Sequence, residues 1–224
     1  MSKINEKDFI ETYEKAYFKG NSKPDGIPRL NQTSCEIETY IESLLNKPEE
    51  YTTQELLEIV SWKAGNLKEL GQPIKCSTGY GISINKEQLE KYLASINQKA
   101  DDIRNKAKNP DNATLLDIYT NMLPEVPKYF GSVYILNLLY FITKRQLPIY
   151  DKFAHKALIA LSTGVAPSEV TVKPAPAKGS KKSVIKMYTE YIHLLENLFG
   201  QKAIGRSLDR ALWVYGHSKI AYTK

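Results

Sequence analysis

The sequence is poor in the residue types that build metal centres and disulfide frameworks. Its 224 residues include 3 histidines and 2 cysteines, Cys35 and Cys76, without the spacing of a metal site. The sequence has no His-Glu-x-x-His, no Gly-x-Ser-x-Gly and no phosphate-binding glycine loop with the required Lys-Ser/Thr or dinucleotide spacing. We therefore expect a protein that binds no metal and no cofactor, and in particular no nucleotide cofactor.

Long hydrophobic runs are also missing. The most apolar stretch, "VYILNLLYFI" (133–142), is too short to span a bilayer. The first residues, "MSKINEKDF", lack the apolar core of a secretion signal. With 42% hydrophobic and 25% charged residues, the composition is that of a globular protein in water. We expect a cytoplasmic protein without a membrane partner.

Acidic residues are scarce in the last quarter of the chain. Residues 173–224 contain ten Lys and Arg against three acids, a local charge of +7, whereas residues 1–172 contain 21 against 22, a local charge of −1. A concentrated positive charge favours a polyanionic partner such as DNA. A solubilising surface would give the same count, so both explanations stay open at this point.

The hydrophobic pattern has the period of helices almost throughout. One stretch, 71–84, could hold a short hairpin, and 166–182, with three prolines and four lysines, is predicted to be a loop. The sequence does not alternate helices with buried strands, so the predicted class is all-α, a two-lobed helical bundle. Helices are predicted at 4–20, 35–47, 52–65, 85–107, 113–123, 133–145, 150–162, 183–200 and 207–222.

We expect residues 1–224 to form a single globular helical unit of two lobes. In this arrangement 113–162 is the central region, and residues 1–112 and 183–224 pack around it. One helix start is explicit in the sequence: Thr52 and Glu55 have the Thr-x-x-Glu spacing of a capping box.

The central region has a distinctive order of elements. A helix leads into "LPEVPKYFG" (123–131), a long apolar helix follows, and the chain then passes through "PIYD" (148–151) into another helix. This order resembles the helix-hairpin-helix DNA glycosylases. Weaker likeness in "SWKAG" (61–65) and "DRALWVYGH" (209–217) points to the oxoguanine-glycosylase-like bacterial branch, which includes phage-defence members.

The resemblance implies a catalytic role for Asp151. In the family, the Asp after the second helix caps the next helix and faces a base flipped out of DNA. A carboxylate there stabilises the positive charge that develops on the sugar as the N-glycosidic bond breaks. The alternative is that Asp151 is only an N-cap, which is the ordinary role of an Asp at a helix start.

The match also implies a monofunctional enzyme. Bifunctional members have a nucleophilic Lys about nineteen residues before the Asp, and in this chain Ser132 stands nineteen residues before Asp151. The nearest candidate is Lys128, which we expect to contact phosphate. The family's Leu-Pro-Gly-Val-Gly hairpin reads here as "LPEVP" (123–127), and Pro127 has no amide hydrogen for a phosphate. Phosphate contacts would then come from later amides at a helix start.

Two groups of residues are candidate site residues, each with packing as the competing explanation. The predicted base pocket contains Trp62, Lys63, Tyr150, Lys152, His155 and Trp213. The predicted DNA-binding residues are Lys128, Phe130, Gly131, Ser132, Arg206 and Arg210. Aromatic rings can stack on bases and basic groups can bind phosphates, but the same residues also build cores and solvated faces.

The predicted function is a monofunctional DNA glycosylase that hydrolyses the N-glycosidic bond of a flipped base in double-stranded DNA. The base is either a damaged base in host DNA or a hypermodified base in phage DNA. A non-catalytic helical DNA-binding protein is the main alternative, and a helical scaffold for acidic proteins is a third. We expect a monomer associated with the nucleoid.

Overall fold

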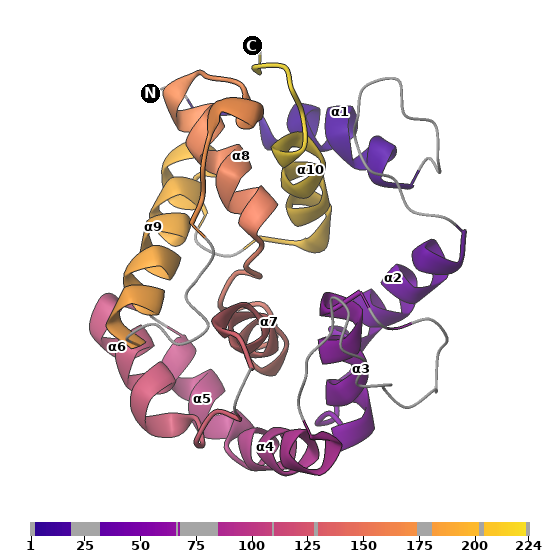
Figure 1. Cartoon of the computed structure of the whole chain (residues 1–224), viewed down its shortest axis with the longest axis vertical. Helices are drawn as coiled ribbons and strands as arrows, with labels where there is room; N and C mark the ends of the chain where they lie inside the picture. Colours follow the sequence, from indigo (N-terminus) through magenta and orange to yellow (C-terminus); the bar gives the residue numbers. More distant parts are fainter. Residues whose placement is uncertain are drawn as a thin grey trace. The chain divides into compact units, whose positions relative to one another are not determined.

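The computed structural model is built of helices (Figure 1). It describes residues 3–18, 32–65, 67, 85–108, 110–127, 130–173, 181–201 and 204–222. Every regular element in these ranges is a helix, which confirms the predicted all-α class. The α-helices are α1 (Glu6–Phe18), α2 (Gln32–Leu44), α3 (Thr53–Lys63), α4 (Lys86–Gln98), α5 (Ala100–Ala107), α6 (Asn112–Asp117), α7 (Ser132–Ile142), α8 (Lys152–Thr163), α9 (Lys181–Phe199) and α10 (Arg206–Gly216).

Two short elements complete the set. The π-helical turn η1 (Ile118–Met122) continues α6, and the 3₁₀ turn η2 (Pro167–Glu169) lies inside the predicted loop 166–182. The possible hairpin at 71–84 lies outside the described residues. No helix in the described ranges is long and apolar enough to cross a membrane.

The chain divides into two compact units. Unit 1 contains Met1–Cys35, Pro148–Pro174 and Met187–Lys224, and unit 2 contains Glu36–Leu147 and Ala175–Lys186. The predicted central region 113–162, with the hairpin and Asp151, is therefore divided between the units at Leu147 and Pro148.

Local signals set several helix boundaries. The predicted capping box of α3 is formed: the Thr52 hydroxyl accepts from Glu55 N at 3.2 Å, and the Glu55 carboxylate accepts from Thr52 N at 2.7 Å. The predicted helix 85–107 is broken at Lys99, whose φ of −101° and ψ of 8° end α4. The last predicted helix is shorter than expected, because α10 ends at Gly216 rather than continuing to residue 222.

Unit 1 has an aromatic core. α10 packs against both α1 and α8 (Figure 1). The Phe9 ring of α1 meets Tyr215 of α10 edge to face at 5.9 Å, and Tyr191 of α9 packs in the same manner against Tyr150 at 5.2 Å. Such aromatic contacts add about 0.5–1.5 kcal/mol each beyond the area that they bury. This core fixes the start of α8, where Asp151 lies.

Unit 2 is organised around α7, which packs against α3 and α5. Seven of its apolar side chains are buried, as its nearly all-round apolar sequence predicts. After α7 the chain reverses through two non-glycine residues with positive φ, Lys144 (48°) and Arg145 (71°). Left-handed backbone costs about 1–2 kcal/mol per residue, so side-chain contacts must hold this turn. The Lys144 amine donates to the Lys47 carbonyl at 2.9 Å and lies 4.0 Å from the centre of the Tyr51 ring.

Candidate active site

The start of α8 presents a carboxylate in a fixed orientation. The chain reaches it through the buried residues Ile149 and Tyr150. Asp151 is the N-cap, with φ −136° and ψ 141°, and its Oδ1 accepts from Phe153 N at 2.7 Å. The helix dipole favours a negative charge at this position. Because Asp151 is partly exposed, its carboxylate combines a fixed position with access from solvent.

Tyr150 and His155 form a buried support beside Asp151. The Tyr150 hydroxyl lies 3.1 Å from His155 Nδ1 and donates to the Met187 sulfur at 3.2 Å. Burial lowers the pKa of His155, so the imidazole is neutral at pH 7. Burial also raises the pKa of Tyr150. With 1% and 2% of their surfaces exposed, Tyr150 and His155 support the helix start from within the core rather than lining an open pocket.

His217, the C-cap of α10, joins this region although it is absent from the predicted site residues. Its ring stacks on Phe153 with centroids 3.6 Å apart, and its Nδ1 lies 2.8 Å from the Trp213 carbonyl. A carbonyl only accepts, so Nδ1 carries the proton in this bond. The stacking depends on Gly216, because a Cβ there would lie 2.0 Å from the Phe153 carbonyl oxygen. The sequence signal that could have found His217 is its close spacing to Trp213 on one predicted helix.

Two further predicted pocket residues belong to the same cluster. Lys152 is exposed, and its amine lies 5.9 Å from the centre of the Phe153 ring. Trp213 is partly buried and meets Phe153 at 6.3 Å and Tyr17 at 5.4 Å, both edge to face. The structure thus brings Asp151, Lys152, Trp213 and His217 around Phe153. We name these five residues the α8 cluster.

Trp62 and Lys63 belong to unit 2, at the end of α3. The Trp62 indole donates to the buried Glu38 carboxylate at 2.5 Å, and its ring meets Phe141 edge to face at 6.1 Å. The Lys63 amine lies 5.9 Å from the centre of the Trp62 ring. These contacts give Trp62 a packing role within its own unit.

Arg206 and Arg210 are buried and ion-paired. Arg206 pairs with Asp209 on the same helix, and the Arg210 guanidinium donates to the Glu14 carboxylate of α1 at 2.6 and 2.8 Å. Buried charges of this kind need a partner to offset the loss of hydration. We therefore give both arginines a structural role in unit 1 in place of the predicted role in DNA binding.

The start of α7 differs from that of α8 in having no side-chain cap. Gly131 is the N-cap, with φ −72° and ψ 153°, and makes no side-chain hydrogen bond. Ser132 follows as the first helical residue, and its buried hydroxyl has no hydrogen-bond partner among the described residues. The Phe130 ring is buried and stacks on Tyr134 at 5.5 Å, so it packs in the core rather than facing DNA. Lys128 lies outside the described residues.

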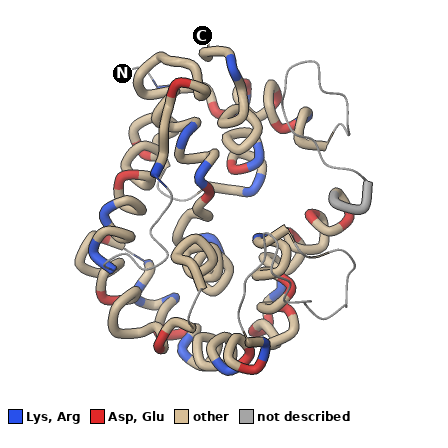
Figure 2. The backbone as a smooth tube through the Cα atoms, viewed as in Figure 1, with Lys and Arg blue, Asp and Glu red and all other residues tan. Residues whose placement is uncertain are grey.

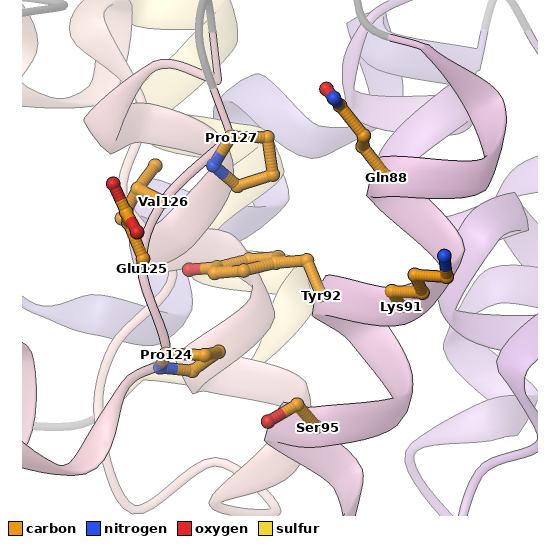
Figure 3. A pocket seen from close by; sticks show the side chains of 8 residues that line it. All are labelled: Gln88, Lys91, Tyr92, Ser95, Pro124, Glu125, Val126 and Pro127. Atoms are coloured by element: carbon orange, nitrogen blue, oxygen red, sulfur yellow. The ribbon is translucent and has the colours of Figure 1, made fainter.

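The segment with the sequence "LPEVP" forms one wall of a groove. The groove has a volume of about 490 Å³ and lies between residues 124–127 and α4 (Figure 3). The Tyr92 ring reaches across from α4, with Pro124 and Pro127 on the opposite side and Lys91 at the edge. The resemblance places the family's hairpin at this segment, but Pro124 and Pro127 have no amide hydrogen to donate, and the phosphate contacts are predicted at the later amides of the α7 start.

Exposed positive charge is concentrated at the start of α9. Lys181, Lys182 and Lys186 are all exposed, and Figure 2 shows basic residues at this end of the helix. The Lys181 amine donates to the Thr120 carbonyl at 3.2 Å. Lysines in a first helical turn oppose the helix dipole, so an anion bound there would relieve an unfavourable charge arrangement. We name these three residues the α9 lysines.

The described residues contain no group of three or more His, Cys, Asp or Glu side chains that could hold a metal ion. Comparisons with protein-family models, with curated proteins and with solved structures found no match to this chain.

Proposed function

We propose that the chain is a monofunctional DNA glycosylase whose catalytic residue is Asp151. The observation that carries the proposal is the carboxylate at the start of α8, held by Phe153 N at 2.7 Å and partly exposed beside aromatic side chains. A fixed negative charge stabilises a sugar cation better than mobile water does, because it needs no reorganisation during the reaction.

In the proposed reaction the bond between the base nitrogen and C1′ breaks, and its electron pair leaves with the base. The positive charge that develops on the sugar is stabilised by Asp151. A water molecule adds to C1′ and loses a proton, and the released base gains one. The products are a free base and an abasic site, with the DNA strand intact.

The absence of strand cleavage follows from the residue at the start of α7. Ser132 occupies the position nineteen residues before Asp151, and a serine hydroxyl cannot form a Schiff base. Hydrolysis by water is the route that this sequence supports.

DNA binding in this proposal uses the α9 lysines and the uncapped start of α7. Backbone amides at a helix start and exposed ammonium groups are the usual partners of phosphate oxygens. The base is either a damaged base in host DNA or a hypermodified base in phage DNA, and the protein acts as a cytoplasmic, nucleoid-associated monomer.

The test is base release from DNA carrying a panel of modified bases, including phage genomic DNA, followed by alkali to cut abasic sites. The wild type should give alkali-dependent cleavage on one substrate class, and Asp151→Asn should not. Asp111→Asn is the matched control, because Asp111 caps α6 through Thr114 N at 2.6 Å. Cleavage without alkali would contradict the monofunctional proposal.

A non-catalytic DNA-binding protein is the second candidate. It is favoured by the hydrogen bond from Phe153 N, since capping alone explains an Asp at this position. This candidate predicts DNA binding that weakens steeply with salt, with no abasic sites on any substrate. A scaffold for acidic proteins would bind DNA no more tightly than other polyanions.

A further inference from the structure

We propose that His217 is the general base of the Asp151 site and that it takes the proton from the attacking water. This inference rests on the proposed function and names the group that completes it. Asp151 can stabilise the charge on the sugar, and a second group is then needed to accept the proton.

The Asp151 carboxylate and the His217 imidazole both contact one residue, Phe153. The Phe153 backbone N–H donates to the Asp151 carboxylate at 2.7 Å. The Phe153 ring stacks on the His217 imidazole with a centroid distance of 3.6 Å. The carboxylate and the imidazole therefore contact a single residue in the first turn of α8, one at its backbone and one at its ring. Gly216 makes this possible, since any side chain there would collide with the Phe153 carbonyl.

The hydrogen bond of His217 selects the nitrogen that can act as the base. Nδ1–H donates to the Trp213 carbonyl at 2.8 Å, so the lone pair of the neutral ring is on Nε2. His217 is partly exposed, unlike the buried His155, and a water molecule can reach it. An imidazole held by one nitrogen and open at the other is the usual arrangement of a general base.

Burial has the largest influence on the pKa of His217 and keeps the imidazole neutral at pH 7. Burial lowers the pKa of His217, the Trp213 carbonyl and the Asp151 charge raise it, and Lys156 of α8 lowers it, with a net decrease. Two acidic groups on the other elements packed against α10 are engaged elsewhere. Glu14 of α1 pairs with Arg210, and Glu169 of η2 accepts from Ala166 N.

His217 carries the proton between the water and the base. The water oxygen bonds to C1′ as the bond to the base nitrogen breaks, and the water proton passes to Nε2 of His217. The imidazolium then returns a proton to the departing base or to solvent. This route needs no covalent intermediate.

The first measurement is an NMR titration of the three histidine imidazoles in the wild type and in Asp151→Asn. If the pair exists, the pKa of His217 falls in Asp151→Asn because the neighbouring negative charge is gone. If the pKa of His217 is the same in the wild type and in Asp151→Asn, the proposed pairing of Asp151 with His217 is wrong, whether or not the protein acts on DNA.

The second measurement is the single-turnover rate of base release against pH. In the wild type the rate should rise with pH through the pKa of His217, below about 6.5, and level off near neutrality. His217→Gln should be about 100-fold slower and lose this dependence. His193→Gln is the matched control.

His217→Phe guards against misfolding, because a phenyl ring can keep the stacking on Phe153 without Nε2. A folded His217→Phe or His217→Gln protein with the wild-type rate and pH profile would overturn the role of His217. If the wild type releases no base, both the proposed function and the role of His217 as general base are wrong. The NMR titration still tests separately whether Asp151 and His217 form a pair.

Discussion

The starts of α7 and α8 both have an N-cap in the extended region of backbone conformation, and the two N-caps have opposite chemistry. Gly131 and Asp151 are both N-caps in the extended region, at ψ 153° and 141°. At α7 no side chain of the N-cap accepts from the first amides, whereas at α8 Asp151 accepts from Phe153 N and adds a negative charge. Both helix dipoles favour a negative charge at this end. At α8 the Asp151 carboxylate supplies that charge, whereas at α7 the N-cap supplies none.

The largest effect is expected from removing the charge at α8 while keeping the cap. Asp151→Ser preserves a good N-cap, so the free energy of unfolding should change by only about a few tenths of a kcal/mol. Base release should fall about 100- to 1,000-fold, because the electrostatic stabilisation of the sugar cation is lost. Thermal unfolding and single-turnover assays on the same preparation measure both. Equal activity of Asp151→Ser and wild type would reduce Asp151 to a cap.

The next prediction concerns the packing that holds the α8 cluster together. Gly216→Ala places a Cβ about 2.0 Å from the Phe153 carbonyl oxygen, and backbone atoms cannot move aside easily. We expect a loss of about 1–3 kcal/mol in the free energy of unfolding, as for other overpacked positions. Urea unfolding measures it. The matched control is Gly205→Ala, since a Cβ there meets nothing within 4 Å.

DNA binding tests whether the α9 lysines contact phosphate. Replacing Lys181, Lys182 and Lys186 with Gln should flatten the salt dependence by up to about 3 in log–log slope, close to 0.9 for each phosphate that is no longer neutralised. Fluorescence anisotropy at several salt concentrations gives the slope. Arg210→Gln is the contrasting variant: it should destabilise unit 1 through Glu14 and leave the slope unchanged. The opposite pattern would return DNA binding to the buried arginines.

The smallest effect comes from making α7 resemble α8. In Gly131→Asp a Cβ meets only ring atoms of Tyr134, at 3.7 Å or more, and the backbone conformation suits an N-cap. The free energy of unfolding should rise by about a few tenths of a kcal/mol, whereas DNA affinity should fall several-fold as the carboxylate occupies the amides. Gly131→Asn separates capping from charge. Unchanged DNA binding by both would exclude the start of α7 as a phosphate site.

The features that the sequence predicted are local ones. The Thr52–Glu55 capping box and Asp151 at a helix start depend on residues three or fewer positions apart, and both are present in the structure. The apolar composition of α7 likewise determined its burial. Such signals can be recognised because the interacting groups are neighbours in the chain.

Features that depend on distant partners were not predictable in this way. Arg210 was predicted to bind DNA, because its ion-pair partner Glu14 lies 196 positions away and cannot be recognised from the neighbouring sequence. His217 became a site residue only through the approach of α10 to Phe153, which requires Gly216. The turn at Lys144 and Arg145 has positive φ values, but it contains no glycine from which they could be predicted. In each case tertiary contacts decided the outcome, and periodicity does not encode them.

The two tryptophans give this protein an optical label in each unit. Trp62 belongs to unit 2 and Trp213 to unit 1, and the sequence contains no other tryptophan. In a Trp62→Phe protein the emission comes from Trp213, within the α8 cluster of unit 1, and in a Trp213→Phe protein it comes from Trp62 in unit 2. Coincident unfolding curves from the two proteins would mean that the units unfold cooperatively, and separate curves would give each unit its own stability.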